Sequence, residues 1–178
     1  IKLIEKNKIK EVSDTDQKLQ FDYVYDYLSG LGYINYEFSS FAKPGYECKN
    51  NITYWNRGKY IGFGPSAHSF DGIKRKWNIS NNQKYIEKIK LNSIAYESEI
   101  LSETDILNEI IMIGLRTSKG LDLDLIESKF SNLNLEKLRQ QIQLKILDGV
   151  LVKTDNKLHP SRDYKFLTDG LASDLFIT

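Results

Sequence analysis

The 178-residue chain is poor in the residues that build disulfides, metal sites and membrane spans. It has one cysteine, two histidines, one methionine and three prolines. A single cysteine excludes an internal disulfide and any metal site made of thiolates alone, and it is typical of a reducing compartment. No apolar run approaches the roughly 20 residues of a membrane-spanning helix. We therefore expect a cytoplasmic protein without a membrane span.

An excess of charge of one sign is also lacking. The sequence has 25 basic and 24 acidic side chains, a net charge of +1. This balance argues against bulk electrostatic binding to nucleic acid or to an anionic membrane. Residues 135–165 hold seven basic and four acidic side chains, which is a thin electrostatic footprint for DNA. Nucleic acid is therefore not expected as a partner.

The first hundred residues alternate helix and strand signals. Residues 13–30 have helical spacing of apolar side chains, a capping serine at Ser13, and glycine stops at Gly30 or Gly32. The stretch YINYEFSSF (33–41) predicts a strand directly afterwards, so the pair forms an α/β unit. A second strand is predicted over 59–63, and a short helix begins near Asn81 or Asn82.

From about residue 102 the sequence becomes mainly helical. Helices are predicted over 104–115, 124–130, 134–149 and 163–176, with a β-hairpin around Asp155-Asn156. The first three of these helices and the hairpin together resemble a winged helix. His159, beside Pro160 in the hairpin, is expected to face solvent. The predicted fold class is α+β with two domains, residues 1–100 and residues 101–178.

One segment, NNITYWNRGKYIGFGPSAHSF (50–70), concentrates aromatics, glycines and one of the two histidines. Gly62 and Gly64 lack Cβ and so allow backbone to approach a ligand closely, although the same residues suit a tight turn. Tyr54 and Trp55 could stack on a flat ring or fill a core. His68 could ligate a metal or carry a proton, or it could be a hydrogen-bonded structural residue.

Four motifs occur in a fixed order: YEFSSFAKPGYECKNNITYW, YIGFGPSAHSF, RKWNISN and EIIMIGLRTSKGLDL. In this order they resemble the C-terminal half of the oxygen-independent coproporphyrinogen III oxidase-like family of radical S-adenosylmethionine (SAM) proteins, above all its heme-chaperone branch. The resemblance implies a C-terminal fragment of a partial (β/α) radical-SAM barrel over residues 1–100. A winged-helix-like, mainly helical domain follows over residues 101–178.

The resemblance also implies a role in porphyrin and heme metabolism, namely heme binding and delivery to client hemoproteins. The alternative is oxidative decarboxylation of coproporphyrinogen III by the full-length enzyme, and a third reading is a winged-helix nucleic-acid-binding module. The expected ligand is heme or another porphyrin. Because a piece of a barrel exposes a sheet edge, we also expect dimerisation, domain exchange or coverage by the chain's own helices.

The family resemblance assigns the candidate binding residues. An HNxxYW motif characterises the heme-binding branch, and Asn51, Tyr54 and Trp55 match its N, Y and W, whereas Asn50 stands at the histidine position. An amide cannot replace imidazole as a strong iron ligand, so His68 is the nearest candidate ligand. Loop residues predicted near the ligand are Gly62, Gly64, Pro65 and Ser66.

The family's 4Fe-4S cluster is held by a CxxxCxxC triplet, and this chain has Cys48 alone. Thiolates are what hold such clusters. We therefore expect a C-terminal fragment that is inactive as an oxidoreductase by itself. The cluster and SAM are expected in the full-length protein.

Overall fold

The computed structural model describes residues 12–93 and 96–178. The N-terminal part contains α2 (Asp14–Gly30), β1 (Ile34–Glu37), β2 (Ser40–Ala42), α3 (Lys49–Trp55), β3 (His68–Phe70), β4 (Lys74–Asn78), α4 (Asn82–Lys90) and β5 (Tyr96–Ile100). The C-terminal part contains α5 (Glu103–Arg116), β6 (Leu121–Asp122), α6 (Leu123–Lys129), α7 (Glu136–Leu147), β7 (Leu151–Thr154), β8 (Lys157–Pro160), the 3-10 helix η1 (Arg162–Leu167) and α8 (Thr168–Asp174). This mixture of helices and strands confirms the α+β class.

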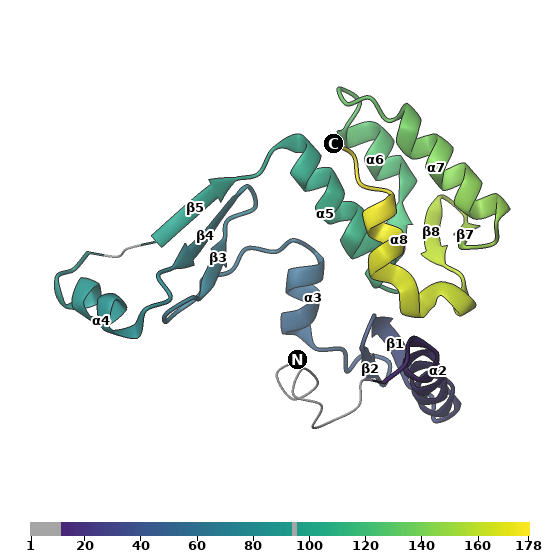
Figure 1. Ribbon diagram of the computed structural model, residues 1–178, viewed down its shortest axis with the longest axis horizontal. Helices are drawn as coiled ribbons and strands as arrows, with labels where there is room; N and C mark the ends of the chain where they lie inside the picture. Colours follow the sequence, from purple (N-terminus) through teal and green to yellow (C-terminus); the bar gives the residue numbers. More distant parts are fainter. Residues whose placement is uncertain (1–11, 94–95) are drawn as a thin grey trace.

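The principal core lies in the C-terminal part (Figure 1). Its buried apolar residues run from Leu107 to Leu175, and Leu107, Leu121 and Leu158 have no exposed surface. Helices α5 to α8 pack around a small antiparallel sheet of order β6-β8-β7. The hairpin turn falls at the predicted place, with Asp155 in the left-handed region at φ 53°. The arrangement is that of a winged helix.

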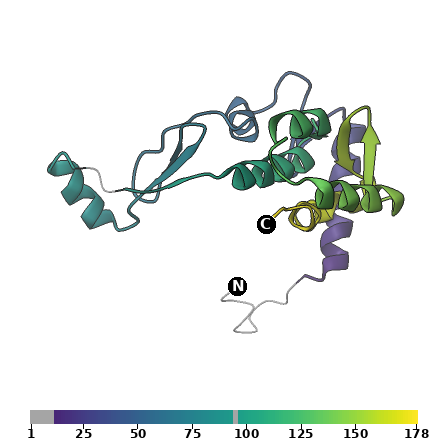
Figure 2. The ribbon, with the colours of Figure 1, turned by 90° about the horizontal axis from the view of Figure 1, so that it is seen from above.

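The N-terminal part is built from small sheets instead of one continuous sheet. β1 and β2 form a hairpin, while β3, β4 and β5 form an antiparallel meander. Figures 1 and 2 show the meander and α4 projecting away from the helical part. Every strand pairing among the described residues is antiparallel. The predicted first domain, residues 1–100, also includes residues 1–11 and 94–95, which lie outside the described residues.

Two predicted strands differ from the structure. The strand predicted over 33–41 is interrupted by a turn at residues 38–39, where the amide of Asn35 donates to the carbonyls of Glu37 (2.6 Å) and Ser40 (3.2 Å). The strand predicted over 59–63 is only an isolated bridge between Tyr60 and Phe70. A single side chain satisfying several carbonyls, and a glycine-rich loop, both end a ladder early.

A polar contact joins α2 to η1 across about 140 residues of sequence. Arg162 forms ion pairs with Asp22 (2.6 Å) and Asp26 (2.9 Å). The Lys18 hydrogen bond, with further help from Arg162, lowers the pKa of Asp22. The guanidinium of Arg162 also lies 4.2 Å from the ring centroid of Tyr25. Helix α2 buries no residue fully. These polar contacts hold it in place together with the Phe21 ring, which lies against the rings of Phe38 and Phe166.

His159 does not face solvent as predicted. Its imidazole is half-buried and packs against Gly120, whose φ is +76° and whose position leaves no room for a Cβ. Burial lowers the pKa of His159, and the charges of Lys165 and Lys157 lower this pKa further. In strand β8, Leu158 and Pro160 are buried on either side of His159. This alternation predicts an exposed His159 and does not indicate that its ring meets the turn at Gly120. In the described part of the chain, no helix is long and apolar enough to cross a membrane.

We predict opposite effects for alanine at two helical glycines. Gly114 of α5 lies against β6, and a Cβ there would come within 2.6 Å of the Leu121 Cα, so overpacking should outweigh better helix propensity and lower the free energy of unfolding by about 1–2 kcal/mol. Gly170 of α8 has open space around a Cβ, so Gly170→Ala should raise it by up to about 1 kcal/mol. Urea unfolding measures both; a stabilising Gly114→Ala would contradict the close packing of α5 on β6.

Acid should destabilise the fold through His159. In the unfolded chain a histidine takes up its proton near pH 6.5, whereas the folded environment lowers the pKa of His159. The free energy of unfolding should therefore fall as the pH drops below about 6.5 and level off below the folded pKa. His159→Gln should remove this part of the pH dependence, and His68→Gln should retain it. Thermal unfolding between neutral and mildly acid pH tests the pair; equal profiles for the two variants would refute the assignment.

Candidate functional site

The aromatic motif lies on the short helix α3. Consecutive residues on a helix differ by about 100° in direction, so its last two side chains diverge. Tyr54 lines a cavity toward the meander and α5, whereas Trp55 contacts the opposite side, with the Arg116 guanidinium 5.4 Å from its ring centroid. Asn51 is half-buried on the same helix, one turn before. The motif thus contributes one aromatic ring to the cavity.

The cavity beside Tyr54 has a volume of about 610 Å³. The rings of Tyr54 and Tyr60 meet edge-to-face with their centroids 4.8 Å apart, and the ring centroids of Tyr60 and Phe70 are 6.1 Å apart. Met112 and Phe176 extend the apolar wall on the side of the helical part. We call this space the aromatic cleft.

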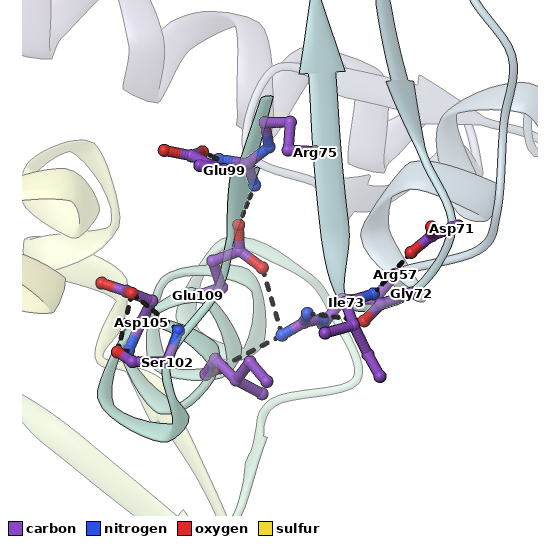
Figure 3. A network of polar contacts seen from close by, with 10 residues as sticks. Arg57, Asp71, Gly72, Ile73, Arg75, Glu99, Ser102, Asp105 and Glu109 are labelled. Carbon is purple, nitrogen blue, oxygen red and sulfur yellow. Dashed lines mark hydrogen bonds and ion pairs between the residues drawn. The ribbon is translucent and has the colours of Figure 1, made fainter. Parts of the chain in front are cut away.

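A charged network forms the rim of the aromatic cleft (Figure 3). Glu109 of α5 lies between Arg57 and Arg75: it pairs with Arg57 at 3.1 Å and with Arg75 at close range. Arg75 also pairs with Glu99 of β5 at 3.1 Å. Arg57 further donates to the carbonyls of Ile106 and Gly72. Three elements of the fold meet at one carboxylate.

The two arginines of the rim respond differently to their surroundings. Burial lowers the pKa of Arg57, and the charge of Glu109 only partly offsets it. Burial also acts to lower the pKa of Arg75, but the hydrogen bond and charge of Glu109 raise it overall. Both guanidinium groups lie over the Phe70 ring, at 5.4 and 6.0 Å from its centroid. The rim is thus electrically balanced and anchored on an aromatic ring.

The glycine-rich loop packs against the chain itself. A Cβ at Gly62 would collide with the His68 backbone, and the Gly62 N–H donates to Ser69 Oγ at 3.0 Å. Gly64 adopts φ +101°, and its carbonyl accepts from the Asn78 side chain at 2.9 Å. Ser66 is also left-handed, at φ 59°, while Pro65 is exposed. The close approach expected of these residues is made to backbone and side chains of the meander.

His68 is exposed at the start of β3 and does not line the aromatic cleft. Its ring stacks on Trp77 at 6.1 Å. Because alternate residues of a strand share a face, His68 lies on the same face of the meander as Phe70. The structure therefore brings Tyr54 together with Tyr60 and Phe70, and leaves Trp55, His68 and the Gly-Pro loop outside the cleft.

Sequence reasoning missed the charged members of the site. Arg57, Arg75 and Glu109 are separated by many residues, so only the tertiary fold pairs them. One local signal is available: Arg57 stands two residues after Trp55 and follows the C-cap of α3 in a left-handed conformation, φ 53°. Among the residues that the structure describes, no group of three or more His, Cys, Asp or Glu side chains could hold a metal ion. Cys48 is exposed and forms no disulfide bond.

Fold and site define an α+β chain with an aromatic cleft against a winged-helix-like part. Comparisons with known proteins agree with this class. Residues 101–163 match the family described as the HemN C-terminal domain. Over 96% of its length the chain superposes on 44% of the coproporphyrinogen III oxidase HemN of Escherichia coli, a radical SAM enzyme, with a TM-score of 0.70 and 16% identity. The fold is therefore that of a portion of HemN.

Two curated relatives are heme chaperones named HemW. The protein of Lactococcus lactis is 32% identical over 138 residues, which are 77% of this chain and 36% of the relative. The protein of Bacillus subtilis is 30% identical over 130 residues, which are 72% of this chain and 34% of the relative. The chain carries a HemN C-terminal domain and is related to HemW, which confirms the family resemblance indicated by its motifs. It spans about a third of the length of these relatives.

We predict that Glu109→Gln lowers the free energy of unfolding by about 1–3 kcal/mol. The side chain keeps its shape but leaves Arg57, which is 14% exposed, without its carboxylate, and losing one partner of a buried ion pair is strongly destabilising, less so when the pair is partly exposed. Glu136→Gln is the matched control, because Glu136 is 63% exposed and should change stability by no more than about 0.5 kcal/mol. Urea unfolding compares them, and similar small effects in both would refute a central role for Glu109.

Proposed function

We propose that this chain is the heme-binding C-terminal part of a HemW-like heme chaperone. The observation that carries the proposal is the similarity to the two HemW proteins over about three quarters of the chain. The ligand is heme or a related porphyrin, and client hemoproteins are the proposed recipients. The proposed division into residues 1–100 and 101–178 assigns the aromatic motif to the first unit and the HemN C-terminal domain to the second.

The aromatic cleft is the proposed place of binding. A flat macrocycle can stack against the rings of Tyr54 and Tyr60, beside the buried Phe70, because offset and edge contacts between aromatic systems are favourable. Its carboxylate side chains would meet Arg57 and Arg75, since guanidinium groups bind carboxylates through paired hydrogen bonds. Glu109 already occupies both arginines, so the ligand must compete with it. Weak binding by this chain alone follows from that competition.

Among the candidate residues outside the cleft, His68 stays the proposed iron ligand. It is two residues from Phe70 on the same face of β3, a separation of about 7 Å along a strand. A macrocycle that stacks on Tyr60 and extends past Phe70 along this face would come within reach of the exposed imidazole. Asn51 and Trp55 support α3, while Gly62, Gly64, Pro65 and Ser66 shape the loop that positions His68.

The full-length protein is proposed to bind a 4Fe-4S cluster and SAM. With one exposed cysteine, the residues of this chain do not fit a cluster that needs three thiolates. Oxidative decarboxylation of coproporphyrinogen III is the alternative activity for the full-length protein. It is supported by the similarity of fold to HemN.

Hemin titration followed by absorbance tests the proposal. The unchanged chain should bind weakly, and Tyr54→Ala should weaken binding by about twofold to tenfold, because an aromatic contact contributes about 0.5–1.5 kcal/mol. His68→Ala should change the Soret band, since replacing an axial ligand changes the field at the iron.

His159→Ala is the control for His68→Ala, because His159 lines a different cavity. This variant should leave the hemin spectrum unchanged. Equal spectral effects of the two histidine substitutions would remove His68 from the proposal. Binding that Tyr54→Ala leaves unaltered would move the heme site away from the aromatic cleft.

A further inference from the structure

A second cavity, of about 480 Å³, lies where α2 and the β1 hairpin meet the end of α5, β8 and η1. Four of its lining residues carry basic side chains: Arg116, His159, Arg162 and Lys165. No aspartate or glutamate is among the described residues that line it. We call this space the basic cavity. It shares no lining residue with the aromatic cleft.

Aspartates that do not line the basic cavity neutralise some of its basic side chains, but not all of them. Arg162 is paired with two aspartates of α2, and Arg116 with Asp169, which is 57% exposed. Lys165, in contrast, donates only to neutral groups, Asn35 Oδ1 at 3.0 Å and the Tyr25 hydroxyl at 3.3 Å. Its positive charge has no carboxylate within ion-pair distance in the part of the chain that the structure describes.

Arg116 supplies a second unsatisfied group. Its Nε is buried and has no hydrogen-bond acceptor among the described residues. A buried donor without a partner destabilises a fold by about 1–3 kcal/mol, so such a group in a native cavity calls for an explanation. An acceptor that enters from solvent would satisfy it. The remaining lining is rich in hydroxyl groups, from Ser29, Tyr33, Thr117 and Ser118 among others.

We propose that the basic cavity binds a small oxyanion, the phosphate or carboxylate group of a small polar molecule, with Lys165 and Arg116 as its charged donors. In the aromatic cleft, by contrast, Glu99 and Glu109 are already paired with the arginines, so an oxyanion would have to compete with a carboxylate there. An oxyanion in the basic cavity would contact α2 and β1 on one side and β8 and η1 on the other. Its binding would therefore strengthen the junction between the two parts of the chain. The proposal does not depend on heme binding.

His159 offers a direct readout in the unchanged protein. Lys165 contributes to the low pKa of His159, and an anion beside both groups would raise this pKa. The chain has only one other histidine, the exposed His68 in the distant meander. Imidazole proton resonances, followed through a pH titration in potassium phosphate and in potassium chloride of equal ionic strength, should show a higher pKa for His159 in phosphate. The His68→Gln variant should show the same rise for His159.

Two variants separate a binding role of Lys165 from a structural one. Lys165→Gln removes the charge but keeps a donor for Asn35, and it should weaken phosphate binding by about tenfold or more, since hydrogen bonds to charged groups contribute about 1.5–3 kcal/mol. Lys153→Gln, on the exposed face of β7, should bind as the unchanged chain does. Isothermal titration with inorganic phosphate, and with malonate as a carboxylate probe, measures the affinity and shows which oxyanion is preferred.

Two outcomes would overturn the proposal. They are a His159 pKa that is equal in phosphate and chloride, and equal losses of affinity in Lys165→Gln and Lys153→Gln. If Lys165→Gln does not fold, the imidazole titration of the unchanged chain decides alone. Hemin binding to the aromatic cleft is measured separately, so a failure of either proposal leaves the other standing.

Discussion

The contact between Glu109 and two arginines is the constraint on which the arrangement of the N-terminal part depends. The meander buries little apolar surface of its own, with Phe70 and Leu101 as its buried members near α5. Arg75 extends from the meander and Arg57 from the end of α3, and both meet the one carboxylate that α5 presents. Tyr60 and Phe70 are held side by side by their own backbone bridge. The ion pairs attach α3 and the meander to α5, and α3 adds the Tyr54 ring, which meets Tyr60 edge-to-face.

A second polar junction ties α2 to η1 by the same principle. Asp22 and Asp26 hold Arg162, while the Tyr25 ring lies under both Arg162 and Lys165, 4.2 and 4.5 Å from its centroid. The C-terminal part has its own apolar core and does not need either junction to pack. Ion pairs and cation–π contacts tolerate rearrangement better than a close-packed core does. Each of the two cavities lies at such a junction, where a ligand can enter without displacing core side chains.

Local signals in the sequence predicted α2, α4, α5, α6 and α7, but they did not predict α3, and the helix predicted over 163–176 is divided into η1 and α8. Ser102 caps α5 in a reciprocal capping box with Asp105, Asn81 caps α4, and Gly149 follows α7 in the left-handed region. Such caps involve neighbours three residues apart, so the sequence displays them directly.

The site was less predictable, because its contacts join distant residues. Glu109 looks like any solvent-facing glutamate of an amphipathic helix until the meander folds back on it. The sequence predicts that His159 faces solvent, because the residue that covers its ring, Gly120, is 39 positions earlier. The Gly62 signal was recognised, but the sequence could not show that the close approach is made to the His68 backbone. The aromatic motif was found by resemblance, and only the structure shows that its two rings point to different places.

That divergence of rings gives α3 a position between the two cavities. Tyr54 lines the aromatic cleft, whereas Trp55 packs on Arg116, whose guanidinium lies 5.4 Å from the indole and 5.3 Å from the Phe38 ring. Arg116 also lines the basic cavity. Helix α3 is seven residues long. It supplies Tyr54 to the lining of the aromatic cleft, and it packs Trp55 against Arg116, which lines the basic cavity. The two cavities therefore have separate linings, and the same short helix supports one of them directly and the other through a single arginine.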